Sequence, residues 1–413
     1  MSERAVAAAD VDIAIVGGGL VGASLALGLS DTGVRVLLLE GTAPASSSQP
    51  SFDERTTALG NASRRIFQAL GVWGEIAPRA AAIRTIHVSD AGRFGFARLR
   101  AEEHGIDAFG YVVANTVIGA ALWKRLAAAP GIALRVPARP ESVEVTPDSV
   151  HFTVASDSGT RERASARLVV AADGAHSSIR AAAGIAAQVE DYEQVAIVAN
   201  VAVDQPHEAT AYERFTPSGP LALLPLHDGS YGVIWSCRPQ RAAQILALDE
   251  GAYLRELQAR FGWRAGRFVG AGRRASYPLK LTRAAATVAP RTVLIGNAAQ
   301  ALHPVAGQGF NLGLRDAAML AEVVANAAGD VGSQALLQTF AEWRAFDRSG
   351  VVRFTDGLVK LFADSRPAVG LLRDLGLLLF DLAPPAKSAL ARVSAGFGGP
   401  TPRLARGLAV RRT

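Results

Sequence analysis

Apolar runs followed by glycines and then by a helical pattern mark the N-terminal part of the chain. Val11–Val16 is a mostly apolar, β-branched run that predicts a buried strand, and positions 23–29 predict a helix. A second apolar run at 34–39 predicts another strand, which ends at Glu40. Strand, helix and strand therefore follow one another, with glycines at the first turn.

Two further strands are predicted later in the chain, and each also leads into a turn and a helix. The run at 168–172 precedes Asp173-Gly174 and a short helix, and the run at 292–295 precedes a glycine-rich loop. The helix after that loop is predicted from apolar residues at helical spacing, namely Leu312, Leu314, Ala318, Leu320, Ala321 and Val324.

The segment between these two strands alternates apolar and polar residues in several short runs. Such alternation predicts an antiparallel sheet with one face against a site. The runs lie at 197–203, 212–215, 221–226, 231–236 and 275–279.

The N-terminal glycines have the spacing of a dinucleotide-binding turn. Gly17 would make the tight turn, Gly19 would let the backbone approach a pyrophosphate, and Gly22 would let the helix pack closely on the strand. Leu20 and Val21 belong to the same predicted binding segment. A glycine-rich turn without a ligand is the alternative, but the strand, helix and second strand stand at the expected offsets.

Glu40 and the later loop extend this prediction. The Glu40 carboxylate can accept hydrogen bonds from both hydroxyls of an adenosine ribose, so the expected dinucleotide is FAD or NAD rather than NADP. In the loop at 296–313, glycines and Asn311 let backbone N–H groups approach a ligand, and the start of the next helix favours negative charge.

The middle segment has two interpretations. Asp173 and Gly174 predict a turn, and Ser177 and Arg180 fall on one face of the helix that follows. The acid and the arginine fit a cofactor-binding motif, and they also fit a salt bridge at the start of a helix.

In order and spacing, the three segments resemble the class A flavoprotein aromatic hydroxylases along nearly the whole chain. The resemblance implies an α/β fold: a Rossmann-like FAD-binding domain similar to that of p-hydroxybenzoate hydroxylase, an inserted antiparallel-sheet substrate domain and C-terminal helices. The expected boundaries are 1–75, 105–182 and 285–350 for the FAD-binding domain, 76–104 and 183–284 for the substrate domain, and 351–413 for a C-terminal helical segment with a basic tail.

Several stretches are similar to the ubiquinone-biosynthesis branch of that family. These are 52–55, 110–118, 213–225 and 307–313, and the sequence at 296–300 looks most like 2-polyprenyl-6-methoxyphenol hydroxylases. Two residues depart from the common family pattern. Asn297 replaces the usual Asp that bonds the ribityl chain, and Gly119 lies where many relatives place an Arg or Gln toward the FAD phosphates.

The resemblance also implies ligands and site residues. FAD is the expected cofactor, NAD(P)H the transient electron donor, and O₂ and a polyprenylated phenol the substrates. Besides Glu40 and the first glycine turn, the expected cofactor-binding residues are Arg55, Asp173, Gly174, Asn297, Gly307, Gln308, Gly309 and Asn311. The expected substrate pocket is formed by Leu223, Pro225 and Pro304.

The chemistry is expected to be carried by the flavin, with the protein supplying position, polarity and exclusion of water. Arg55, His303 and Pro304 are the candidates for a direct catalytic role. His303 could act as the base that deprotonates a phenol, but the favoured interpretation is a structural residue packed under the loop, because the sequence shows no partner that would orient the imidazole.

Composition narrows the remaining possibilities. The chain has 413 residues, 49% of them hydrophobic and 19% charged, and a formal net charge of +6. The single cysteine, Cys237, excludes an internal disulfide, and the histidine spacing supports no metal site. The basic residues form no stripe interleaved with aromatics, so no nucleic-acid partner is expected.

Neither a signal peptide nor a membrane span is expected from the sequence, which favours a cytoplasmic location. Apolar residues at 371–390 followed by arginines at 392, 403, 406, 411 and 412 fit either peripheral contact with the inner face of the membrane or a helical cap over the core.

Two alternative functions stay open at this point. One is a flavin hydroxylase of a small soluble aromatic acid, which would need a cationic group in its pocket. The other is a non-catalytic flavin-binding subunit that associates with other ubiquinone-biosynthesis proteins, for which the departures at Asn297 and Gly119 leave room.

Overall fold

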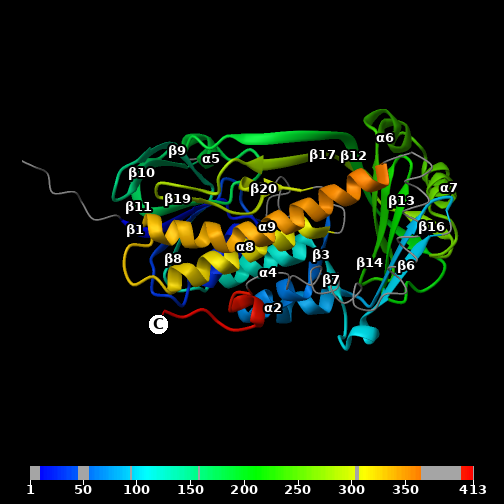
Figure 1. The fold of residues 1–413 in the computed structure, drawn as a ribbon, viewed down its shortest axis with the longest axis horizontal. Coiled ribbons are helices and arrows are strands. Elements are labelled where there is room, and N and C mark those ends of the chain that lie inside the picture. The colour runs from blue at the N-terminus through cyan, green and yellow to red at the C-terminus, as the bar shows by residue number, and fades with distance from the viewer. Residues whose placement is uncertain are drawn as a thin grey trace, which may run out of the picture.

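Three β-sheets and the helices around them make up the computed structural model, which describes residues 10–44, 55–93, 95–156, 159–302, 307–363 and 401–412. Sheet 1 occupies one half of the elongated molecule, sheet 2 the other half, and the small sheet 3 lies between them (Figure 1). The α/β architecture expected from the sequence is confirmed.

Sheet 1 contains the strands that precede the three glycine-bearing turns. Its central strands are all parallel and run in the spatial order β19 (Thr292–Leu294), β11 (Arg161–Ala171), β1 (Val11–Val16), β2 (Val36–Leu39) and β8 (Ile132–Arg135). Antiparallel partners complete it: β18 (Val288–Ala289), β10 (Val150–Ser156) and β9 (Ala138–Val145). The carboxyl ends of parallel strands are where open α/β sheets bind ligands.

The two faces of sheet 1 are covered differently because side chains alternate along a strand. In β1, Ile13 and Ile15 belong to a core shared with the helices, whereas Ala14 and Val16 pack in a second core with β10. The helices of the first core include α1 (Leu20–Leu29), α4 (Asn115–Ala127) and α8 (Gln308–Ala325). The helices predicted at 23–29 and from Leu312 onward are thus confirmed.

Sheet 2 is the predicted substrate-side sheet. Its strands follow the order β20 (Gln300–Ala301), β17 (Ala275–Ala284), β12 (Ala187–Val203), β15 (Tyr231–Cys237), β14 (Gly219–Pro225), β13 (Thr210–Thr216), β5 (Thr85–Asp90) and β6 (Phe96–Arg100), with β16 (Phe268–Ala271) paired to β12. The pairs are antiparallel except for β13 with β5, a parallel pair that the sequence did not predict. The long strands β12 and β17 extend from this sheet across to sheet 1 (Figure 1).

The remaining elements connect or cover the sheets. Sheet 3 consists of β3 (Thr56–Gly60), β7 (Gly110–Ala114) and β4 (Ala81–Ile83). The other α-helices are α2 (Asn61–Ala69), α3 (Trp73–Ile76), α5 (Ser178–Ala182), α6 (Pro239–Leu246), α7 (Glu250–Phe261) and α9 (Gln334–Ala363). Short 3₁₀ turns form η1 (Ala77–Arg79), η2 (Ala101–His104), η3 (Gly296–Ala298) and η5 (Leu404–Arg406).

The predicted domain boundaries can be compared with the sheets. All strands of sheet 1 come from the segments assigned to the FAD-binding domain. Sheet 2 draws most of its strands from the segments assigned to the substrate domain, but its edge strand β20 comes from the segment 285–350. Helix α9 runs through the boundary predicted at 350.

Residues 401–412, within the predicted basic tail, pack on the protein through their apolar residues. Leu404, Ala405 and Val410 are buried in the core formed with α1 and α2, while Arg406 and Arg412 are exposed. Apolar residues between the arginines therefore hold 401–412 on the protein. The helices predicted within 371–390 lie outside the described residues. No helix formed by the described residues is long and apolar enough to cross a membrane.

Candidate active site

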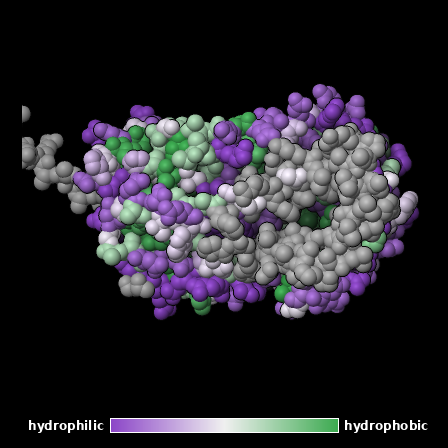
Figure 2. Space-filling view, viewed as in Figure 1, coloured by the Kyte–Doolittle hydropathy of each residue, from purple (hydrophilic) through white to green (hydrophobic). Residues whose placement is uncertain are grey.

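One cavity of about 1410 Å³ lies between sheets 1 and 2. Its lining includes residues from all three glycine-bearing segments, among them Gly17, Asp173 and Gly309. In the space-filling view a hollow opens on the sheet 2 half of the molecule, and hydrophobic residues are visible inside it (Figure 2). Segments far apart in the sequence thus meet around a single cavity, as the sequence predicted.

The first glycine turn begins where β1 ends. Gly17 has φ +103°, and a Cβ atom there would lie 2.4 Å from the carbonyl oxygen of Ala172, at the end of β11. A Cβ atom on Gly22 would lie 1.9 Å from the carbonyl oxygen of Gly17. Only glycine fits these two positions, so the roles predicted for Gly17 and Gly22 agree with the geometry.

Gly18 is sterically constrained, and the spacing of the glycine turn predicted no role for it. A Cβ atom there would lie 2.6 Å from the Trp123 ring and 2.9 Å from the Glu40 Cβ. The Trp123 indole N–H donates to the Gly18 carbonyl at 3.0 Å, and the Gly18 N–H donates to Glu40 Oε2 at 2.6 Å. Because Trp123 comes from α4, about a hundred residues away, this contact is invisible in the local sequence.

Glu40 lies in the cavity lining, as predicted, and its carboxylate accepts hydrogen bonds from two backbone N–H groups of the protein. Its Oε2 accepts from the Gly18 N–H and its Oε1 accepts from the Thr42 N–H at 2.8 Å. A carboxylate offers about four acceptor positions, so two remain for a ligand. The predicted ribose contact is compatible with this arrangement and stays a prediction.

Asp173 follows β11 and carries a buried atom without a partner among the described residues. Its Oδ2 accepts from the Ser178 N–H at 2.8 Å and from the Ser178 hydroxyl at 3.1 Å, whereas Oδ1 is buried and accepts no hydrogen bond there. Buried polar atoms are nearly always satisfied, so an orphaned carboxylate oxygen in a cavity wall indicates a ligand donor. Gly174, with φ +88°, continues the same wall.

Arg180 joins the second glycine-bearing segment to the third. Its guanidinium donates to the carbonyl oxygen of Ala298 at 2.9 Å and to that of Ala175 at 2.8 Å. The alternative of a helix-start salt bridge with Asp173 is therefore wrong, because both terminal nitrogens bond backbone carbonyls. Ser177 caps α5 by accepting the Arg180 N–H at 2.9 Å.

The Asn311 side chain connects the start of α8 to sheet 3 through hydrogen bonds. Its Oδ1 accepts from the Gly60 N–H at 2.9 Å and the Ser63 hydroxyl at 2.6 Å, and its Nδ2 donates to the carbonyls of Ala58 and Gly307, each at 2.8 Å. The amide has no further hydrogen-bonding capacity. The Asn311 side chain therefore positions the loop, and the prediction that Asn311 binds the cofactor refers to the backbone N–H groups of that loop and stays a prediction.

Gly307 begins α8 in a left-handed conformation. Its φ is +60°, and a Cβ atom there would lie 3.2 Å from the Ala58 Cβ of β3. Gln308 and Gly309 form the first turn of the helix and line the cavity. Their N–H groups belong to a helix start, where the backbone favours negative charge.

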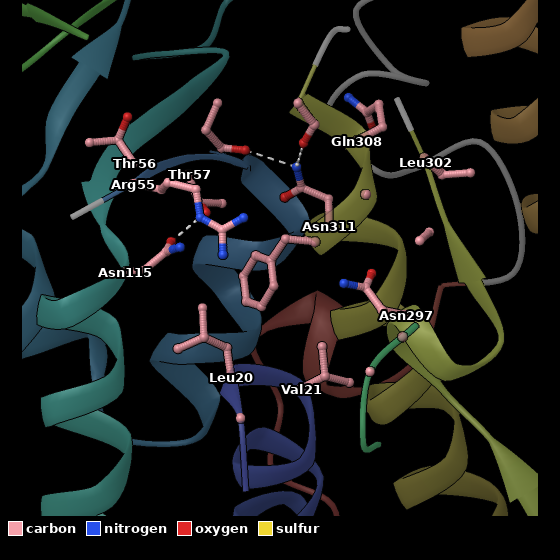
Figure 3. A pocket seen from close by; sticks show the side chains of 18 of the residues that line it. Leu20, Val21, Arg55, Thr56, Thr57, Asn115, Asn297, Leu302, Gln308 and Asn311 are labelled. Carbon is pink, nitrogen blue, oxygen red and sulfur yellow. Dashed lines mark hydrogen bonds between the residues drawn. The ribbon is translucent and has the colours of Figure 1, made fainter. Parts of the chain in front are cut away.

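Figure 3 shows how the other predicted residues surround the cavity. Leu20 and Val21 enter from α1, Arg55 lies on the sheet 3 side, and Asn297 and Gln308 lie opposite it. The Arg55 guanidinium stands 4.7 Å from the centroid of the Tyr277 ring, an arrangement that favours a cation. Asn297 extends from η3 and is exposed to the cavity.

A buried charge cluster that the sequence did not reveal supports η3. Asp316 Oδ2 accepts from the Gly296 N–H at 3.1 Å and from the Gln300 amide at 3.0 Å, and its Oδ1 accepts from Arg344 at 2.7 Å and Arg348 at 3.3 Å. Burial disfavours ionisation of Asp316, but the two guanidinium groups outweigh it and hold the pKa of that carboxyl below its usual value. Asp347 bridges Arg344 to Arg315 in the same cluster.

The prediction of the substrate pocket is partly wrong. Leu223 packs fully buried in the core on the far side of sheet 2, and Pro225 shares its position in the strand alternation. Their neighbours Ala222 and Leu224 line the cavity instead, because successive residues of β14 face opposite sides. Two of the three candidates for direct catalysis, His303 and Pro304, lie outside the described residues.

Glu213 lines the cavity, and in the sequence it belongs to the stretch 213–225 that resembles the ubiquinone-biosynthesis branch. It lies on β13 between Ala211 and Phe215, which face the cavity with it. Burial raises the pKa of Glu213 to about 7, and no described side chain forms a hydrogen bond or ion pair with its carboxylate. The sequence signal that could have identified Glu213 is an acidic residue at a position where the alternation of the strand predicts an apolar one.

The family is settled by comparison with known proteins. The family model described as FAD binding domain matches residues 10–355. Ubiquinone hydroxylase UbiL of Rhodospirillum rubrum is 37% identical over 404 residues, which cover 96% of this chain and 93% of that protein. This chain belongs to the class A flavoprotein aromatic hydroxylases, in their ubiquinone-biosynthesis branch.

Further comparisons agree with that assignment. The 3-demethoxyubiquinol 3-hydroxylase of Escherichia coli strain K12 is 33% identical, covering 90% of this chain and 95% of that protein. The crystal structure of p-nitrophenol 4-monooxygenase PnpA from Pseudomonas putida DLL-E4 has a TM-score of 0.77 at 20% identity, with 94% and 98% of the two chains covered. The latter similarity establishes the shared fold.

The hydroxylase is an FAD-dependent aromatic-ring monooxygenase with NAD(P)H as its electron donor. Bound FAD would activate O₂ and supply the transferred oxygen atom. The residues present fit this cofactor. Gly17 and Gly19 line the cavity at the predicted pyrophosphate turn, Glu40 retains acceptor capacity, and Asp173 Oδ1 can accept a hydrogen bond. At the start of α8, Gly307 and its neighbours would stabilise negative charge on the flavin.

Proposed function

We propose that this hydroxylase oxidises the ring of a polyprenylated phenol, of the 2-polyprenyl-6-methoxyphenol type, in ubiquinone biosynthesis. The observation that carries the proposal is that the cavity continues from the cofactor-binding turns into an arm walled by sheet 2. The arm is apolar, and its described lining includes Ile86, Val88, Ala97, Leu99, Phe109, Ala222, Leu224 and Ile234. An apolar wall suits a substituted ring with a hydrocarbon tail.

The reaction balances with the reactants of the family. One O₂, one NAD(P)H and one proton convert a ring C–H into a C–OH and yield NAD(P)⁺ and water. Two electrons from the donor and two from the ring reduce both oxygen atoms. The chain contributes the positions of ring and cofactor and the exclusion of water from the apolar arm.

A small aromatic acid is the less suitable substrate. A ligand carboxylate needs a cationic partner when it is buried. Among the described residues, Glu213 is the charged member of the arm's wall, and a carboxylate ligand would be repelled by it. Elsewhere in the described lining the cations are Arg55, Arg139 and Lys280. Lys280 pairs with Asp191 at 3.3 Å, and Arg55 lies over the Tyr277 ring. The arm itself, with Glu213 as its charged residue, favours a neutral phenol.

The proposal is tested by analysing quinones in cells that lack the gene. We expect ubiquinone to disappear and a prenylated precursor that lacks one ring oxygen to accumulate, as read by mass spectrometry. The wild-type gene should restore ubiquinone, and Gly19→Asp, which places a side chain and a charge at the pyrophosphate turn, should not.

Other outcomes would point elsewhere. Unchanged ubiquinone in the deletion strain would contradict the proposal, and rescue by a Gly19→Asp protein shown to lack FAD would indicate a non-catalytic role. Because the proposed substrate is a lipid, contact with the inner face of the cytoplasmic membrane and with other ubiquinone-biosynthesis proteins belongs to the same proposal.

A further inference from the structure

We propose that Glu213 is the catalytic base of this hydroxylase: its carboxylate accepts the hydrogen bond of the substrate's ring hydroxyl and removes its proton as the ring is oxygenated. The inference rests on the proposed function, since it requires a phenolic substrate in the apolar arm. It assigns a chemical role to one residue of the sheet 2 wall.

The strand register places Glu213 in the middle of an apolar surface. Across the sheet it pairs with Ala222 on β14 and with Val88 on β5, and both of these line the cavity. Along β13 its neighbours on the same face are Ala211 and Phe215. A carboxylate beside four apolar neighbours has no hydrogen-bond partner among the described side chains, so a donor on a ligand would offset the cost of placing its charge there.

The sheet 2 wall that carries Glu213 adjoins sheet 3, which leads to the residues predicted to hold the flavin. A Cβ atom on Gly232 would lie 3.2 Å from Thr56 Oγ1, and Gly232 pairs with Leu224 on β14. Ala222, the partner of Glu213, is two residues from Leu224 on the same face, a distance of about 7 Å along the strand. Sheet 3, which contacts Gly307 at the start of α8, thus adjoins the wall that carries Glu213.

The surroundings keep Glu213 ready to exchange a proton near neutral pH. Burial is the cause that raises its pKa to about 7, with no contribution from a described charged group. The facing positions on β14 and β5 are apolar. Arg214 alternates onto the opposite face of β13, and the Tyr212 ring packs there against Phe261, although Tyr212 also borders the cavity. A general base works best when its pKa lies near the operating pH.

The proton transfer balances as follows. The O–H bond of the phenol breaks, its electron pair stays on the ring oxygen, and the proton moves to a Glu213 oxygen. The ring becomes more electron-rich and takes up the oxygen atom that O₂ and NAD(P)H supply in the family reaction. When aromaticity returns, the oxygenated ring carbon loses its hydrogen as a proton, and the second oxygen atom of O₂ takes up that proton as it leaves in water. Glu213 then gives its own proton back to the ring oxygen.

The test compares holoenzyme variants with a 2-dimethylallylphenol probe and with its methyl ether, which has no hydroxyl proton. Glu213→Gln removes the base at nearly constant shape, and Glu213→Asp keeps a carboxylate. Glu208→Gln makes the same charge change at an exposed residue outside the cavity lining. FAD content, NAD(P)H oxidation and hydroxylated product are measured as functions of pH.

For wild type we expect product formation from the phenol to rise with pH through about 7, because Glu213 must be ionised to accept the proton. Glu213→Gln should keep FAD and NAD(P)H oxidation but form product on the order of 10²-fold more slowly at neutral pH. Its residual rate should increase as the pH approaches the phenol's own pKa of about 10. Glu213→Asp should restore the rise in rate at the lower pH, and Glu208→Gln should have the rate and pH profile of wild type.

Three results would overturn the inference. The first is Glu213→Gln with the wild-type rate and pH profile, which leaves the proposed function intact. The second is an equal loss of rate with the methyl ether, which would show a structural role. The third is a wild-type rate that does not rise as the pH increases through about 7. This measurement does not depend on whether the Glu213→Gln protein folds. A wild-type holoenzyme that hydroxylates no prenylated phenol would overturn the proposed function together with this inference.

Discussion

Gly22→Val is expected to yield a protein that lacks FAD. A Cβ atom at position 22 would lie 1.9 Å from the carbonyl oxygen of Gly17 and 3.1 Å from the Cβ of Ala172, so α1 cannot stay where it is. Displacing α1 moves the glycine turn that would contact the pyrophosphate. Overpacking of this kind costs about 3 kcal/mol or more, which lowers FAD affinity by roughly 100-fold or more.

The measurement is the visible absorbance and the FAD content per chain after purification. Gly74→Ala is the matched control, because a Cβ atom there would meet nothing within 4 Å. It should retain the FAD content of wild type. Full occupancy of the Gly22→Val protein would mean that the turn at 17–22 does not hold the cofactor.

Asp316→Asn is expected to destabilise the protein by about 3–5 kcal/mol, since removing one member of a buried ion cluster leaves the others uncompensated. Asp316 is 0% exposed and Arg344 is 1% exposed, and the two are joined at 2.7 Å. The loss should appear in the free energy of unfolding from denaturant titration. Glu141→Gln, in an exposed pair with Arg161, should change little.

The same residue predicts a pH dependence. The folded pKa of Asp316 lies below its unfolded value, so its contribution is fully present above the unfolded value near 4 and is lost as pH falls through the folded value. Wild type should therefore lose stability in acid more steeply than Asp316→Asn does. Parallel curves for the two proteins would show that Asp316 is not held ionised by Arg344 and Arg348.

The parts of the fold that were predictable are those whose signal is local. The strand β1, the helix α1 and the strand β2 follow from adjacent runs, and the conformation of Gly17 follows from its place in the fingerprint. The meeting of three distant segments was predictable only because each carries its own glycine-bearing turn at the end of a parallel strand.

The parts that were missed depend on contacts across the fold. Choosing Leu223 rather than Leu224 for the pocket wall is a one-residue error, and in a strand one residue separates the core from the cavity. The cluster around Asp316 joins α8 to α9, and Leu404 reaches the core of α1 from the far end of the chain. No local pattern encodes these pairings.

A crystal structure of the protein with FAD bound would show whether the three glycine-bearing segments hold one cofactor. We expect one FAD molecule per chain that contacts Gly17 and Asp173 and places its ring system beside Gly307 and Gly309, with the apolar arm of sheet 2 next to that ring. An FAD molecule bound in another cavity, or one that contacts Gly17 while Asp173 and Gly309 face elsewhere, would contradict this expectation.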